Sequence, residues 1–373
     1  MNYKRHKLYT ILILSGVFMI SLSMSCDKDS DTTTIEAEFD SKEHLTNVYV
    51  NGILPLNNQL TNQAQLLSAS VNLFSTETTE GNLELVQKEW REFQEIWKQL
   101  ELYDLGAIAN SFISFEINRW PTDIIRIEQN IRGTEDLIEE FIASIGSSSK
   151  GISAIEYLIF SLDSNTEVLT KFTTDENAAG RKKYLLALSE NLYTKSLTLK
   201  NLWETNEENF INALENGISG SQNQLVNAMV ALIEEIMKSK LGAPLGDTNG
   251  GTVDPKQLEA YYGAFSKEII QQHLKTLQNC FTGDFGQAGT QVGFDDLLIF
   301  RDHKNVADKI VMQFSVCQDK LDAISGKLRD DIVTKEEEVM ALKNSFRDLL
   351  VLLKVDMASI LGTTITFNDS DGD

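Results

Sequence analysis

The chain is poor in the residues that interrupt helices or cross-link small folds. It contains only 4 prolines and 3 cysteines in 373 residues. So few cysteines exclude the disulfide framework of small secreted domains. Apart from Cys26 only Cys280 and Cys317 remain, and the sequence leaves open whether they pair in an oxidising compartment. The long segments between the prolines are free to form helices.

Basic residues are also scarce, with 33 Lys and Arg against 55 Asp and Glu and a formal net charge of −22 at pH 7. A surface with this charge repels phosphate backbones, so we expect no nucleic acid partner. It suits cationic partners and metal ions, although many acidic surfaces serve solubility alone.

Histidine is rare, and the recognisable catalytic motifs are missing. Beyond residue 25 the chain has His44, His273 and His303, which are far apart in sequence. There is no HExxH motif, no cysteine pair at zinc-binding spacing, no P-loop and no GxSxG motif. Because a zinc hydrolase needs two or three clustered ligands, we interpret the three histidines as surface residues.

The N-terminus has the pattern of an export signal. Three basic residues within the first seven positions precede an almost entirely apolar run at 8–22, and a short polar stretch, Ser23 to Ser25, leads to Cys26. We predict that residues 1–25 are a lipoprotein signal peptide and that Cys26 becomes the lipid-modified first residue. An uncleaved anchor and an ordinary signal peptide with a chance cysteine are the alternatives, since Ser23 stands where leucine is usual.

Acidic segments follow Cys26 and end the chain. Residues 26–39 cannot bury apolar surface, so we predict a flexible tether. Residues 365–373 include a stretch like the start of a calcium-binding loop but lack its distal glutamate, so we interpret them as a solvated acidic tail. The signal and the tether together predict a protein of the bacterial cell envelope, attached to a membrane at its periplasmic face or in the outer membrane.

Apolar residues recur at helical spacing through most of the chain. Six of them form one stripe with alternating steps of three and four: Leu83, Val86, Trp90, Phe93, Trp97 and Leu100. The pattern returns from Val339 to Leu353. Further helices are predicted at 183–203, 222–240, 255–281 and 303–327. Strand patterns are nearly absent, so the predicted fold class is all-α, built as helix bundles.

The folded part exceeds one typical hydrophobic core, and roughly 340 residues favour two domains or an internal duplication. We place the boundary so that an N-terminal helical bundle covers 40–178 and a C-terminal helical bundle covers 179–364. Helical periodicity weakens at 104–122. The glycine-rich segment 242–254 predicts a loop before a helix that starts near Pro255.

A short apolar segment contains an unusual carboxylate. Residues 151–160 are apolar on nearly every side and predict a buried helix, yet Glu156 lies in the middle. An ionised carboxylate there is costly unless it is paired or liganded. Ser153, three residues earlier, lies on the same helical face, so the two residues form a polar site. The alternative is a structural ion pair between Glu156 and a buried arginine such as Arg119.

Four sequence blocks, in their order along the chain, resemble the imelysin-like family of envelope proteins, once classed as metallopeptidases. The blocks are Trp90 to Trp97 with Tyr103 and Asn118-Arg119-Trp120-Pro121; Lys150 to Phe160; Lys240 to Leu245 with Pro255, Leu258 to Tyr262 and Ser266; and Gly293 to Leu298. The resemblance covers about residues 40–360.

The resemblance implies two helical bundles that face each other across a polar pocket, with a G-x-H-x-x-E motif at that pocket. Gly151 and Glu156 match this motif, but Ser153 replaces its histidine, and a hydroxyl is a poor substitute for imidazole as a metal ligand or base. The expected metal ligands are Glu156 and Glu259. Besides Glu259, the pocket residues implied by the resemblance are Arg119, Trp120 and Ser266.

Three functional hypotheses follow. The first is a lipid-anchored binding protein that captures a metal ion (iron or another divalent cation) or an iron carrier for an iron-uptake partner. The second is a metallopeptidase with Glu156 as general base and a metal-bound water. The third is a non-catalytic module whose acidic surface binds an outer-membrane partner protein. The missing histidine makes enzyme activity the weaker expectation.

Overall fold

The computed structural model describes residues 38–289 and 291–366. The predicted signal peptide, the predicted lipidation site Cys26, most of the predicted tether and most of the predicted acidic tail lie outside the described residues. Within the described part, the chain consists of helices, turns and loops, without a strand. The prediction of an all-α fold is therefore confirmed.

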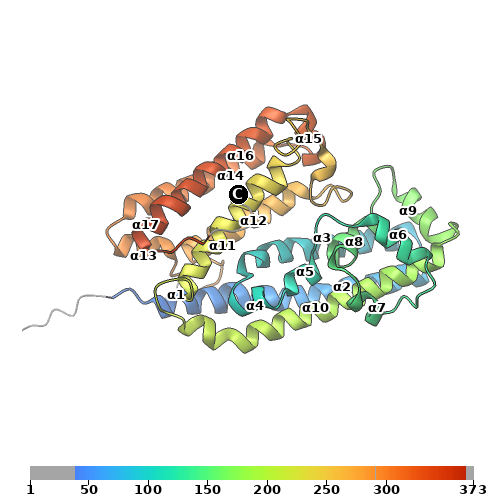
Figure 1. Ribbon diagram of the computed structural model, residues 1–373, viewed down its shortest axis with the longest axis horizontal. Coiled ribbons are helices and arrows are strands. Elements are labelled where there is room, and N and C mark those ends of the chain that lie inside the picture. The colour runs from blue at the N-terminus through green and yellow to red at the C-terminus, as the bar shows by residue number, and fades with distance from the viewer. Residues whose placement is uncertain (1–37, 290, 367–373) are drawn as a thin grey trace, which may run out of the picture. The chain divides into compact units, whose positions relative to one another are not determined.

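The helices follow one another with short connections (Figure 1). The α-helices are α1 (Ser41–Asn47), α2 (Leu54–Thr76), α3 (Glu80–Leu100), α4 (Gly106–Asn110), α5 (Ile113–Ile117), α6 (Ile124–Arg132), α7 (Glu139–Ser144), α8 (Gly151–Ile159), α9 (Asn165–Thr173), α10 (Ala178–Asn212), α11 (Ser221–Glu235), α12 (Ser266–Thr282), α13 (Phe294–Phe300), α14 (Lys304–Ala323), α15 (Leu328–Thr334), α16 (Glu336–Val351) and α17 (Ala358–Leu361). Segments of π-helix are η1 (Val48–Ile53), η4 (Ile236–Gly242) and η6 (Leu352–Met357), and 3₁₀ turns are η2 (Glu101–Tyr103), η3 (Ser147–Ser149) and η5 (Pro255–Gln257).

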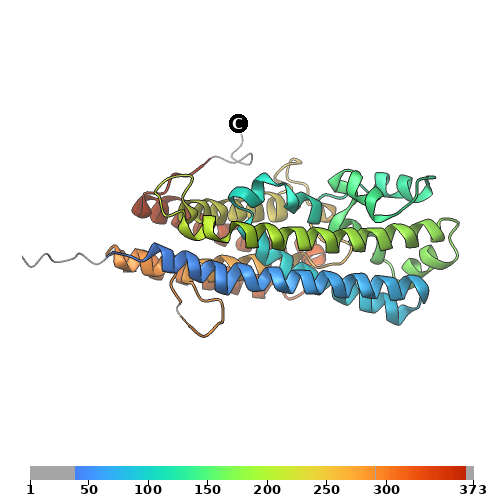
Figure 2. The ribbon, with the colours of Figure 1, turned by 90° about the horizontal axis from the view of Figure 1, so that it is seen from below.

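The N-terminal helices pack around α2. Helix α10 lies along α2 over much of its length (Figure 2), and α3 packs on α2 after a short turn. The Thr79 side chain caps the start of α3 by accepting from the Asn82 backbone N–H. All six residues of the stripe predicted in this helix are buried. Because α10 packs most extensively with α2, the predicted domain boundary at residue 178 gains no support from packing.

The C-terminal helices form a second group, in which α14 packs against both α12 and α16. Helix α11 continues into η4, and η4 packs on α16. Contacts between α3 and α12 join this group to the N-terminal helices. Two buried polar residues, Lys98 of α3 and His273 of α12, lie on the helices that make these contacts.

One predicted helix begins later than expected. The sequence pattern favours a helix from Pro255, but only η5 forms there and α12 starts at Ser266. The reason is the backbone of the intervening turn, in which Ala260 and Ala264 have φ of 54° and 50°. Right-handed helix cannot continue through such residues. Residues 243–254 form the predicted loop, whereas Gly242, its expected first residue, still belongs to η4.

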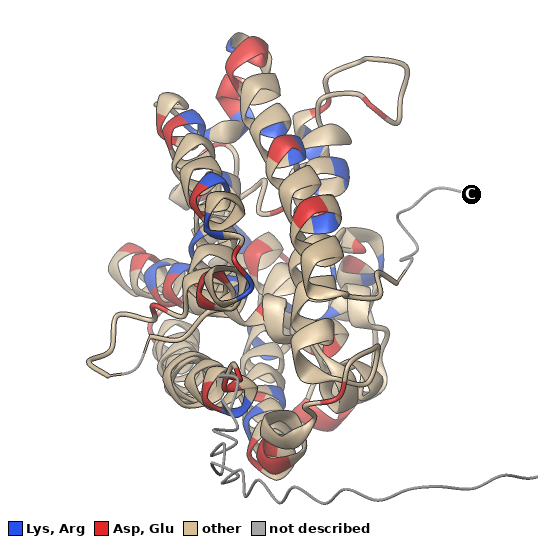
Figure 3. Ribbon diagram, turned by 90° about the vertical axis from the view of Figure 1, so that its left-hand side faces the viewer, with Lys and Arg blue, Asp and Glu red and all other residues tan. Residues whose placement is uncertain are grey.

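Charged residues are interspersed along the helices (Figure 3). Among the described helices, none combines the length and apolarity that a membrane crossing needs.

Candidate functional site

A glycine brings two short helices into close contact. Gly151, the first residue of α8, has φ of 73°, and a Cβ atom there would lie 2.3 Å from the backbone oxygen of Ile117, the last residue of α5. Only glycine permits this approach. As a result Ser153, on α8, meets Asn118, which follows α5, and its hydroxyl donates to Asn118 Oδ1 at 2.6 Å.

Glu156 is held by backbone and not by a charged partner. Its side chain is buried, and Oε1 accepts from the Gly263 backbone N–H at 2.9 Å. Burial raises the pKa of Glu156 to about 7, although the hydrogen bond from Gly263 opposes this increase. The alternative of an ion pair with Arg119 is wrong, because Arg119 is exposed and its guanidinium lies 4.7 Å from the ring centre of Phe115.

Glu259 occupies the centre of a buried ion-pair network. Its Oε1 accepts from Lys98 Nζ at 2.6 Å and from Asn118 Nδ2 at 2.9 Å, and its Oε2 accepts from Lys240 Nζ at 2.6 Å. Burial alone would raise the pKa of Glu259, but the ammonium groups of Lys240 and Lys98 lower it to about 2. Ser266 donates its hydroxyl to the Glu259 backbone carbonyl and thereby fixes the turn that carries the carboxylate.

Glu101 extends the network toward α12. Its Oε1 accepts from Lys98 Nζ at 2.6 Å, and its Oε2 contacts His273 Nε2 at 2.8 Å. Burial lowers the pKa of His273, so a neutral ring donates its Nε2 proton to the carboxylate. Burial favours a higher pKa for Glu101, but the charge of Lys98 and the hydrogen bond from His273 hold that pKa well below its ordinary value.

The network carries more negative than positive charge. Lys240 also pairs with the half-exposed Glu235 at 2.7 Å, so three carboxylates share two ammonium groups. The two lysines are buried. Removing one member of such a network leaves an uncompensated buried charge.

A pocket of about 540 Å³ lies beside this network. Its walls come from α3 and η2, from the segment after α4, from α11 and η4, and from Glu259. Three aromatic residues, four carboxylates and one arginine line it: Trp97, Phe115 and Trp120; Glu101, Asp104, Glu235 and Glu259; and Arg119. We call this site the acidic pocket. Asn118 also lines it, so the hydroxyl of Ser153 fixes an amide of the pocket wall.

The residues expected from the sequence thus fall into two sets. Arg119, Trp120 and Glu259 line the acidic pocket. The remaining expected residues lie behind the wall: Gly151, Ser153, Glu156 and Ser266. They set the positions of the wall residues and of the turn that precedes α12.

The donor groups of the site do not fit a bare metal ion. Both oxygens of Glu259 are occupied by ammonium groups, and Glu156 accepts from a backbone N–H. Among residues 38–289 and 291–366, no group of three or more His, Cys, Asp and Glu side chains is arranged to hold a metal. The expected ligand pair Glu156 and Glu259 therefore belongs to a hydrogen-bonded core.

Sequence reasoning missed several residues of the site, among them Lys98, Glu101, Lys240 and Asp104. One signal was present: Lys98 follows Trp97 in α3, and Glu101 lies one turn further on the same side.

The interpretation of the histidines as surface residues is wrong for two of the three. His44 and His273 are fully buried, and only His303 is exposed. Burial lowers the pKa of His44 to about 3, and its Nδ1 accepts from Gln222 at 2.9 Å. The two cysteines are buried free thiols.

The fold and the site together define the class of this protein: it is all-helical, and a buried ion-pair network borders a pocket of small-molecule size. The sequence matches the Imelysin family over residues 53–354, and the chain belongs to this family. This confirms the resemblance drawn from the sequence blocks.

Individual relatives are distant in sequence, and two solved structures are similar in fold. The chain is 20% identical to iron-regulated protein A of Synechococcus elongatus over 296 residues, which cover 75% of this chain and 74% of that protein. The crystal structure of an imelysin-like protein from Psychrobacter arcticum matches with a TM-score of 0.73 at 19% identity, covering 88% of this chain and 97% of that one. A putative iron-regulated protein A precursor from Parabacteroides distasonis matches with a TM-score of 0.71 at 16% identity and the same coverage.

Proposed function

We propose that this chain is a lipid-anchored protein of the bacterial envelope. Its acidic pocket binds an organic carrier with a bound metal ion, and iron is the metal that we expect. The construction of the pocket carries the proposal: Gly151 and Ser153, two positions of the family motif, act together to fix Asn118 in its wall. A volume of about 540 Å³ lies within the range of small-molecule sites. The names of two relatives associate those proteins with iron regulation.

The charges of the pocket favour a metal held by an organic carrier over a bare ion. A divalent cation at Glu259 would have to displace Lys98 and Lys240, each 2.6 Å from the carboxylate. A carrier supplies its own metal ligands, so the pocket wall only needs to provide hydrogen bonds and aromatic contacts.

Calorimetry with a blocked pocket tests this function. Ala231 lines the pocket, and Ala231→Trp would fill it without changing charge. Ala323→Trp, at an exposed position of α14, is the matched control. The probes are ferric citrate, a ferric trihydroxamate and ferrous sulfate. We expect one ferric chelate to bind wild type and the control at one site, and to lose binding in Ala231→Trp. Failure of both chelates to bind wild type, or equal binding to all three proteins, contradicts the proposal.

Lipid anchoring rests on the sequence at Cys26. We expect Cys26→Ser to release the protein from the membrane fraction and to abolish incorporation of an alkyne-labelled fatty acid in the native host. Labelling that persists in this variant would contradict the anchor.

One observation favours a partner protein, such as a component of iron uptake in the outer membrane. Phe112 and Phe115 are exposed, and their rings stack with centres 6.3 Å apart next to the pocket. Capture of a partner from envelope extracts by wild type, and its loss in Phe112→Ser, would support this second role. Equal capture by both proteins would contradict it.

The metallopeptidase hypothesis receives no support from the donor set. Ser153 is committed to Asn118, and the buried His273 contacts Glu101 instead of Glu156.

A further inference from the structure

Asp104 is the carboxylate of the acidic pocket that has no cationic partner. The other three carboxylates of the pocket take part in ion pairs with Lys98 or Lys240. Within the described part of the chain, no basic side chain forms an ion pair with Asp104, and its buried Oδ1 accepts no hydrogen bond. The Ser114 side chain hydrogen-bonds the Asp104 carboxylate, but Oδ1 itself has no donor. A buried acceptor without a donor is destabilising, and a ligand could supply one.

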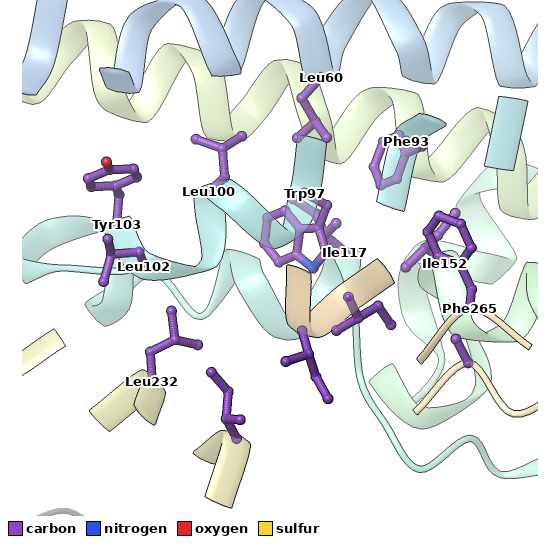
Figure 4. Close-up of a cluster of buried hydrophobic side chains, with 14 of the residues drawn as sticks. Leu60, Phe93, Trp97, Leu100, Leu102, Tyr103, Ile117, Ile152, Leu232 and Phe265 are labelled. Atoms are coloured by element: carbon purple, nitrogen blue, oxygen red, sulfur yellow. The ribbon is translucent and has the colours of Figure 1, made fainter. Parts of the chain in front are cut away.

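The same pocket contains a donor without an acceptor. Trp97 lines the pocket, is only 2% exposed, and its indole Nε1 has no hydrogen-bond partner. Figure 4 shows its ring among the buried side chains of Leu60, Phe93 and Leu100. Since an indole nitrogen only donates, a complementary ligand presents an oxygen to it.

The aromatic wall is suited to a cation. Phe115 and Trp120 both line the pocket, and aromatic faces attract ammonium and guanidinium groups. The wall already holds one cation in this way, because the Arg119 guanidinium lies 4.7 Å from the ring centre of Phe115.

The net charge of the groups around the acidic pocket is negative, which favours a cationic ligand. The network of three carboxylates and two lysines keeps one excess negative charge. Asp104 adds a carboxylate. The exposed Arg119 adds one positive charge to the lining, so one excess negative charge remains. A ligand with a positively charged group therefore meets a net negative charge in the acidic pocket.

We infer that the acidic pocket binds an organic ligand through a primary ammonium group, which donates to Asp104 Oδ1, while an oxygen of the ligand accepts from Trp97 Nε1. A bare metal ion has no hydrogen to donate to Asp104 Oδ1 and no acceptor for Trp97 Nε1. The inference rests on the proposed function in one respect, that the acidic pocket is the ligand site, and it specifies which chemical group of the ligand is recognised.

A pair of chelates that differ only at the ammonium group tests the inference in the mature full-length protein. The probes are a linear ferric trihydroxamate with a terminal primary ammonium group and the same chelate with that amine acetylated. Wild type should bind the ammonium form at least about tenfold more tightly. Asp104→Asn should remove the preference and keep its affinity for the acetylated form, which shows that the variant is folded. Asp319→Asn, at an exposed position of α14, is the control and should behave as wild type.

A second pair of probes separates the inference from the role in metal binding. These probes are 2-phenylethylammonium and its neutral counterpart 2-phenylethanol, titrated into wild type and Asp104→Asn. If neither chelate binds but 2-phenylethylammonium binds in a manner that depends on Asp104, the ammonium site stands and the metal-carrier function falls. If both chelates bind wild type with equal affinity, the ammonium site is overturned and the carrier function stands. Absence of binding by all four probes overturns both.

Discussion

Replacing Glu156 by glutamine should change how the stability of the protein depends on pH. Burial raises the pKa of this carboxyl from 4.5 to about 7, so the folded state favours its protonated form. The contribution of Glu156 to the free energy of unfolding is therefore fully present below pH 4.5 and is lost as the pH rises through 7. Glutamine keeps the shape and an acceptor for the Gly263 N–H but has no charge to bury.

The size of the effect follows from the two pKa values. At ~1.4 kcal/mol for each pH unit, the increase from 4.5 to about 7 corresponds to about 3 kcal/mol. The free energy of unfolding of Glu156→Gln, relative to wild type, should therefore rise by about 3 kcal/mol between pH 4.5 and pH 8.

Urea denaturation of both proteins at these two pH values measures the difference directly. Other groups titrate in this range, but they contribute equally to both proteins and cancel. Glu190→Gln, at an exposed position of α10, is the control and should show a nearly constant difference from wild type. A difference for Glu156→Gln that stays constant between pH 4.5 and pH 8 would refute the reasoning.

Three further substitutions test the parts of the site by urea denaturation. Lys98→Met leaves the carboxylates of Glu101 and Glu259 without their shared ammonium group and should lower the free energy of unfolding by about 3–5 kcal/mol. Lys88→Met, at an exposed side chain, should lower it by less than ~0.5 kcal/mol. Equal losses in the two variants would contradict the buried network. Gly151→Ala places a Cβ 2.3 Å from a backbone oxygen and should cost more than ~1 kcal/mol, while Gly146→Ala, where no atom lies within 4 Å of the added carbon, should be nearly neutral. Ser153→Ala removes the donor to the asparagine of the pocket wall and should cost about 1–3 kcal/mol; unchanged stability would mean that this hydrogen bond is dispensable.

The helical architecture could be predicted from the sequence because it depends on local periodicity. The stripe from Leu83 to Leu100 places its apolar residues on one face whatever the rest of the chain does, and this face is buried in α3. The error after Pro255 has a local cause that composition does not reveal. Alanine is a strong helix former, yet Ala260 and Ala264 adopt left-handed backbone angles in the turn that presents Glu259.

The candidate site could be predicted from the sequence only in part. The sequence predicted that Ser153 and Glu156 lie on a buried helix, and both side chains are buried there, each hydrogen-bonded to a different segment. Their partners were not predictable, since Ser153 bonds a residue 35 positions away and Glu156 one 107 positions away. Lys98 and Glu259 are 161 positions apart. A polar residue beside an apolar stripe is exposed on an isolated helix, and only the packing of α3 against other polar groups buries it.

The burial of His273 was missed for a different reason. The surface interpretation rested on the separation of the three histidines in the sequence. His273 in fact lies three residues after Ile270 and four before Leu277, on the apolar face of α12. The carboxylate of Glu101 on the facing segment supplies the hydrogen bond that makes burial tolerable.

Binding of a metal carrier in the acidic pocket is tested most directly by a crystal structure grown with a ferric chelate and recorded at the iron absorption edge. We predict an anomalous peak inside the pocket, with the organic part of the chelate in contact with Asp104 and Trp97. An iron peak between Glu156 and Glu259, or a pocket without any iron signal at a saturating concentration of chelate, would contradict this assignment.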